Sequence, residues 1–159
     1  MSNVAEQLDT KSPMIQWLNA LGSFYMKDIR ALPTEQLTVS PGGCARSAQA
    51  ITGEVIGLCR FATRTLRSEA TDDSYNVDLT GLNTGDQLAE AVQTAIAEFG
   101  DAIANAPEEI WTQEVMPPWQ MKDTVWGITN IAINHIWYHD GQINTYQCLL
   151  GDDKVHWMD

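Results

Sequence analysis

The chain has 159 residues, 44% of them hydrophobic. This suits one globular domain, residues 1–159, with enough apolar surface for a core, and excludes general disorder. Twenty-one acidic and nine basic residues give a net charge of −12, which argues against nucleic acid as a partner because phosphates would be repelled. The same charge disfavours anionic membrane surfaces, and no apolar stretch is long enough to span a bilayer.

The amino terminus and the cysteines bear on the compartment. The first residues contain neither a basic start nor an apolar stretch of the kind that a secretory signal has, so we expect a cytoplasmic protein. Cys44, Cys59 and Cys148 are odd in number and form no CxxC pair. This argues against a disulfide framework and against a thiolate zinc site, and predicts reduced thiols.

Two helices are predicted in the first half of the chain. The first covers about residues 13–32, where apolar residues recur at a helical period and Ser12-Pro13 has the pattern of an N-cap followed by proline. The second covers about residues 45–68, and its apolar stripe from Ile51 to Leu66 indicates one buried face.

A third helix is predicted after a long polar connection. Thr84 and Gln87 have the spacing of a capping box, so this helix should begin there, and it should end near Pro107. A second irregular stretch follows, with adjacent prolines at 117 and 118 that a helix interior does not accept.

The fourth predicted helix covers about residues 121–150 and ends at Gly151, a residue type that favours helix termination. No segment shows the strict alternation of a half-buried strand. The sequence therefore predicts an all-α four-helix bundle without a sheet, with long connections after the second and third helices.

The last predicted helix carries two histidines on its apolar stripe. Steps of three or four residues join the members of this stripe, so all of them should face inward: Ile128, Ile131, His135, His139, Gln142, Tyr146 and Leu149. Histidines four residues apart have Cβ atoms roughly 5–6 Å apart, so both rings can reach one metal ion. Two histidines at this spacing can also be hydrogen-bonded in a core without a metal.

The second predicted helix adds a carboxylate, Glu54, on or beside its inward stripe. A buried carboxylate is costly unless it is paired or coordinated, and His135 and His139 are natural partners. Together the three residues would form a metal site with at least one position left for water or substrate, as catalytic sites have. Such a ligand set suits zinc, nickel or ferrous iron. We expect Gln142 to support the site rather than to bind the ion.

Other residues have weaker assignments. Asp140 directly follows His139 and should point about 100° away around the helix, into solvent. Trp111, Trp119 and Trp126 surround the second irregular stretch and could line a substrate pocket or pack in a core or dimer interface. His156 lies in the carboxy-terminal tail and could fold back over a pocket mouth.

The last helix resembles the DinB/YfiT-like metalloenzyme superfamily. Its segment NHIWYHDGQINTYQCLLG matches an HxxxHxGQ-type element followed by an aromatic residue and a leucine-rich end with glycine; the matching residues are His135, His139, Gly141, Gln142, Tyr146, Leu149, Leu150 and Gly151. The second predicted helix resembles the family segment that usually supplies a third histidine, but this chain has Glu54 there. The resemblance implies a divalent metal, often zinc or nickel, and frequently a homodimer.

Characterised branches of this superfamily are thiol-dependent isomerases and S-transferases that use a low-molecular-weight thiol. The resemblance thus implies an enzyme that acts on a small molecule, by thiol-dependent transfer or isomerisation or by hydrolysis. The alternative is a non-catalytic dimeric bundle that binds a partner and in which Glu54, His135 and His139 form a buried polar network. A metal-responsive sensor is a third interpretation.

Overall fold

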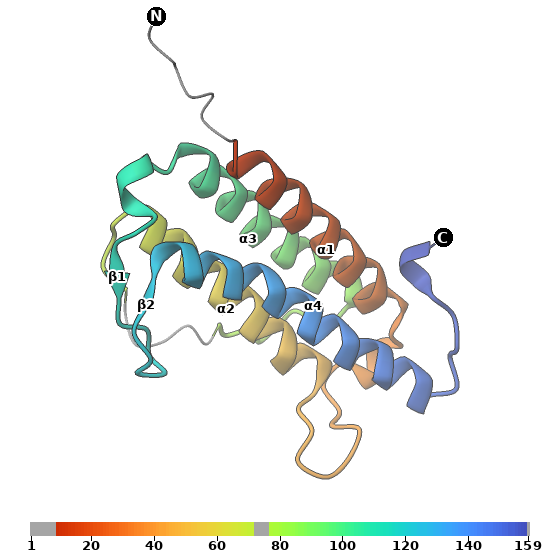
Figure 1. The fold of residues 1–159 in the computed structure, drawn as a ribbon. Coiled ribbons are helices and arrows are strands. Elements are labelled where there is room, and N and C mark those ends of the chain that lie inside the picture. The colour runs from red at the N-terminus through yellow and green to blue at the C-terminus, as the bar shows by residue number, and fades with distance from the viewer. Residues whose placement is uncertain (1–8, 72–76, 159) are drawn as a thin grey trace, which may run out of the picture.

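A computed structural model describes residues 9–71 and 77–158, which form four long helices (Figure 1). These are α1 (Lys11–Ala31), α2 (Ala48–Leu66), α3 (Gly85–Asn105) and α4 (Val125–Leu149). Part of the polar connection between α2 and α3 and the first eight residues, on which the expectation of no secretory signal depends, lie outside the described residues. The predicted all-α four-helix bundle is confirmed, and so are its two long connections.

The helices pack so that α1 and α2 do not lie against each other. Helix α1 packs against α3 and α4, and α2 packs against the same two helices (Figure 1). The buried side chains are mostly apolar, and the largest fully buried ones include Leu18, Tyr25, Ile51, Phe99, Ile128 and Ile136. Burying each such side chain contributes ~1.5–3 kcal/mol, so this core holds α2 and α4 together. No helix within the described residues has the length and hydropathy needed to cross a membrane.

Side-chain caps set where α2, α3 and α4 begin. Ser47 accepts a hydrogen bond from the Ala50 N–H at 3.2 Å, so α2 begins at residue 48 rather than at 45. The capping box predicted at Thr84 is present at the start of α3. Thr124 accepts from the Gly127 N–H at 3.1 Å, so α4 begins at residue 125 rather than at 121.

A small antiparallel sheet precedes α4, so the prediction of no sheet was wrong. Strand β1 (Glu114–Val115) pairs with β2 (Asp123–Thr124). Strands of two residues are too short to give an alternating pattern, and the prolines at 117 and 118 lie in the turn that returns the chain. The Val125 N–H then donates to the Gln113 carbonyl at 2.9 Å, which ties the start of α4 to this hairpin.

Helix α3 begins in close contact with α1 at Gly85. A Cβ atom on this glycine would lie 2.7 Å from the Ile29 carbonyl oxygen and 2.8 Å from the Arg30 Cα. Real Cβ atoms do not approach backbone atoms this closely, so only glycine permits this packing.

The carboxy-terminal tail folds back onto α1 through the 3-10 helix η3 (His156–Met158). The ring of Trp157 lies 5.1 Å from that of Phe24, measured between centroids. His156 contacts Asp152 within the tail, with Nε2 2.8 Å from Oδ2. The tail thus packs against a helix, and His156 has a partner of its own there.

Candidate metal centre

Glu54, His135 and His139 converge where α2 packs against α4. One potential ligand atom from each lies within 4.8 Å of the others. The two histidine Nε2 atoms are 3.0 Å apart, and the Nε2 of His139 is 3.5 Å from Glu54 Oε2. A tetrahedral ion with bonds of ~2.0–2.2 Å separates its ligand atoms by about 3.3–3.6 Å, so small shifts suffice to seat one.

The two histidines are buried to different degrees. His139 is fully buried, His135 is half-buried and the Glu54 side chain is 24% exposed. The predicted stripe was wrong at two positions, since Ile131 is 41% and Leu149 66% exposed. Contacts with both α1 and α2 widen the buried arc of α4 and move it away from these residues.

The tautomer of His139 follows from its partner Gln142. Its Nδ1 lies 2.8 Å from Gln142 Oε1, which can only accept, so Nδ1–H donates and Nε2 presents its lone pair. That lone pair faces a carboxylate oxygen of Glu54 and the Nε2 of His135. Acceptor atoms that face one another in a buried place need a cation or a proton between them.

Burial keeps both imidazoles neutral at neutral pH. It lowers the pKa of His135 to about 4, with smaller contributions from His139 and from the positive charge of Arg46. Burial lowers the pKa of His139 too, although its hydrogen bond to Gln142 acts in the opposite direction. The contact between His139 and Glu54 is therefore not an ion pair at pH 7, and both rings are in the state that binds metals.

Arg46 completes the surroundings of Glu54. Its Nη1 pairs with Glu54 Oε1, which leaves Oε2 for His139. The Tyr146 hydroxyl donates to the Arg46 carbonyl and so anchors this residue just before α2. Sequence reasoning missed Arg46 because the predicted helix over residues 45–68 included it, away from the apolar stripe, whereas in the structure it precedes α2. Its positive charge, opposite to that of a nearby inward carboxylate, was the available signal.

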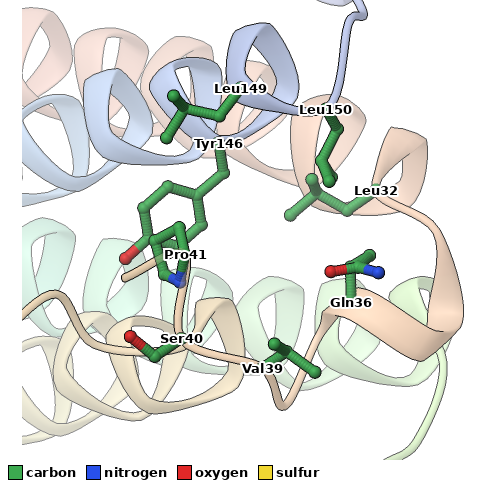
Figure 2. Close-up of a pocket in the computed structure, with 8 residues that line it drawn as sticks. All are labelled: Leu32, Gln36, Val39, Ser40, Pro41, Tyr146, Leu149 and Leu150. Carbon is green, nitrogen blue, oxygen red and sulfur yellow. The ribbon is translucent and has the colours of Figure 1, made fainter. Parts of the chain in front are cut away.

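Two cavities lie beside these residues, and Tyr146 lines both. The first has a volume of about 260 Å³ and is lined by Cys44, Ala45, Arg46, Gln142, Thr145 and Tyr146. The second, of about 210 Å³, has mostly apolar lining residues; Figure 2 shows Leu32, Pro41, Tyr146, Leu149 and Leu150 among them.

Asp140 is buried, so the prediction that it is solvated was wrong. It is only 3% exposed and faces Asp28 of α1, which is fully buried. Burial, followed by repulsion from Asp28 and their hydrogen bond, raises the pKa of Asp140 to about 8. Asn144 and Gln147 donate to Asp28 at 2.7 and 2.9 Å. The prediction treated α4 as having one buried face, whereas its α1 side is buried as well.

The three tryptophans near the hairpin do not gather at the site. Trp111 is buried, Trp119 packs against Phe61 and Trp126 is exposed. None of them lines either cavity. Tyr138 is the aromatic residue beside the histidines, with its ring 5.0 Å from that of His139.

Comparisons with known proteins agree with this architecture. A DinB-like protein from Bacillus subtilis, YjoA, has the same fold with a TM-score of 0.67 and 15% identity, over 87% of this chain and 92% of that one. A variant of the mycothiol-dependent maleylpyruvate isomerase gives a TM-score of 0.62 and 15% identity, over 84% of this chain and 60% of that one.

Sequence comparison identifies the family. No curated protein is similar enough in sequence to count as a relative. The model of the DinB family matches residues 1–159, the whole chain. The protein therefore belongs to the DinB family.

Proposed function

We propose that this protein is a metal-dependent enzyme in which Glu54, His135 and His139 hold a divalent ion, zinc or nickel first and iron next. The observation that carries the proposal is the convergence of two neutral imidazoles and one carboxylate oxygen, with the lone pair of His139 Nε2 turned toward the other two groups. This donor set, with nitrogen and oxygen ligands, matches those that zinc, nickel and iron accept.

The residues around the ligands would support such an ion. Gln142 holds the His139 ring with its Nδ1 protonated, and Arg46 holds one Glu54 oxygen so that the other faces the histidines. When bound, the ion would supply Lewis-acid chemistry, which polarises a carbonyl or lowers the pKa of a bound thiol or water.

The proposed substrate is a small molecule, and the proposed reaction is thiol-dependent transfer or isomerisation, or hydrolysis. Support comes from the fold shared with a mycothiol-dependent maleylpyruvate isomerase. A cobalt-substituted protein tests the thiol part, because a thiolate bound to cobalt gives an intense near-ultraviolet absorption band. Titration with 2-mercaptoethanol should produce this band, and its absence would favour hydrolysis. A homodimer and a cytoplasmic location stay predictions.

A buried polar network is the competing function, and one contact favours it. Arg46 already pairs with Glu54, and the 3.0 Å between the histidine Nε2 atoms is also a hydrogen-bond distance if His135 carries its proton there. The protein would then be a non-catalytic binding module with no need for a metal.

Elemental analysis separates the two functions. The protein is purified without an affinity tag, and its metal content is compared with those of His135→Ala, His139→Ala and Glu54→Ala. Asn134→Ala serves as the control, because Asn134 lies on the same helix, is exposed and donates from its side chain to the Asn130 carbonyl. We expect about one metal per chain in wild type and control, and loss in the three variants. A wild type that cannot be loaded with zinc or nickel contradicts the proposal.

A further inference from the structure

The larger of the two cavities lies directly beside the candidate metal centre. Two of its wall residues each contact a proposed ligand: Arg46 pairs with Glu54, and Gln142 accepts from His139. A molecule in this cavity would therefore be one residue away from the ion.

The charges around the cavity favour an anion. Among the described residues, no acidic one lines it, although the chain as a whole has a net charge of −12. Arg46 and Glu54 form an ion pair and offset each other, so a divalent ion at the three ligands would bring two positive charges that none of the described residues lining the cavity neutralises. In a partly buried place such an excess attracts an anionic ligand.

The hydrogen-bonding groups of the wall narrow the class of anion. The Tyr146 and Thr145 hydroxyls already donate to the carbonyls of Arg46 and Gly141. The Gln142 Oε1 accepts from His139, which leaves its amide NH₂ as a donor in the wall that also contains Arg46. A guanidinium binds the two oxygens of a carboxylate bidentately, and the amide beside it adds a donor but no second positive charge to match the larger charge of a phosphate.

We propose that this cavity binds the carboxylate of a small organic acid, with Arg46 as its recognition residue. The position of the acid beside an ion and the excess of positive charge rest on the proposed function, whereas the hydrogen bonds from Arg46 and Gln142 rest only on the residues of the cavity wall. The cavity volume of about 260 Å³ lies below the ~300–1,000 Å³ of pockets for drug-sized ligands, so the acid is small.

Propionate and its neutral counterpart propionamide test the proposal. Backbone amide shifts of the ¹⁵N-labelled chain are followed at constant ionic strength, first with a chelator present and then with zinc. Propionate should move the amides of Cys44 and Thr145 saturably, and propionamide should not. Arg46→Gln should weaken propionate binding about tenfold or more. Arg60→Gln, which removes the same charge from an exposed site on α2, should leave it unchanged.

Several outcomes would overturn the proposal. Equal shifts with propionamide, or equal losses in Arg46→Gln and Arg60→Gln, would mean that no carboxylate site exists at Arg46. If Arg46→Gln does not fold, Arg46→Lys replaces it as the variant. The comparison of propionate with propionamide in wild type still shows whether the cavity binds a carboxylate.

The zinc arm tests the position of the acid separately. Zinc should tighten propionate binding, and stoichiometric zinc without this effect overturns the placement of the acid beside the ion. If zinc does not bind, the proposed function fails, while the titration with chelator still decides whether Arg46 binds carboxylates.

Discussion

His139 donates through Nδ1 to Gln142 Oε1, one turn further along α4, at 2.8 Å. Partners of this kind orient a metal-binding histidine and raise its basicity. Gln142→Leu should therefore weaken zinc binding by about 10–100-fold, whereas Gln142→Glu should retain it because a carboxylate accepts the same hydrogen bond. Competition with a chromogenic chelator gives both affinities, with Asn134→Ala as the control. Equal affinities of Gln142→Leu and wild type would show that the hydrogen bond does not support metal binding.

The buried pair of Asp28 and Asp140 predicts a pH-dependent stability. Because the pKa of Asp140 rises from 3.8 to about 8 on folding, the folded chain holds an extra proton between these values. Its contribution to stability is complete below pH 4 and is lost as the pH rises toward 8. In Asp140→Asn this loss disappears, because asparagine stays neutral and can still donate to Asp28.

We expect the melting temperature of wild type, relative to that of Asp140→Asn, to fall by roughly 5 °C between pH 6 and pH 8.5. Calorimetry with a chelator present measures this difference without interference from metal binding. Parallel curves for the two proteins would show that Asp140 does not hold the extra proton.

Removal of the Tyr146 hydroxyl tests whether it anchors Arg46. Tyr146→Phe removes the hydrogen bond to the Arg46 carbonyl but keeps the ring in the walls of both cavities. Urea denaturation should show a loss of about 0.5–1.5 kcal/mol in the free energy of unfolding. Tyr25→Phe is the comparison, because it removes a buried hydrogen bond to Thr52 that does not involve Arg46. Only Tyr146→Phe should also weaken propionate binding, and equal propionate binding in both variants would contradict the anchoring role.

Alanine substitutions at two glycines of α3, Gly85 and Gly100, test the packing of this helix against α1. Gly85→Ala should destabilise the chain by about 1–3 kcal/mol, because the new Cβ would press on backbone atoms of α1. Gly100→Ala should leave stability unchanged or raise it by up to about 1 kcal/mol, because its Cβ would meet nothing nearer than 3.9 Å and alanine favours the helix. Denaturant midpoints compare the two, and a similar change in both would refute the packing argument.

Local signals in the sequence predicted the helices well. The capping box at Thr84 is a pattern of four residues, and apolar residues recur along α2 at helical spacing. Both features could therefore be predicted without tertiary information. The hairpin could not be predicted, because the pairing of two-residue strands depends on the turn between them. The burial of Asp140 could not be predicted either, since it depends on which two helices pack against α4.

The candidate site also contains residues that the sequence predicted and residues that it could not predict. The histidine pair is visible because both rings lie on one helix, and the structure brings Glu54 to them as the sequence suggested. Metal binding itself stays a prediction. Arg46 and the cavity beside it arise from a loop folded against α4, and no periodic pattern describes such a contact.

The location of the three proposed ligands has a consequence for folding order. His135 and His139 are neighbours on one helix, so even a chain without tertiary structure can present them together when that helix forms. Glu54 comes from the other half of the sequence and joins them only when α2 docks on α4. An ion that needs all three ligands would therefore bind only late in folding, after α2 has docked on α4. Its binding would show that the two halves of the chain have packed together.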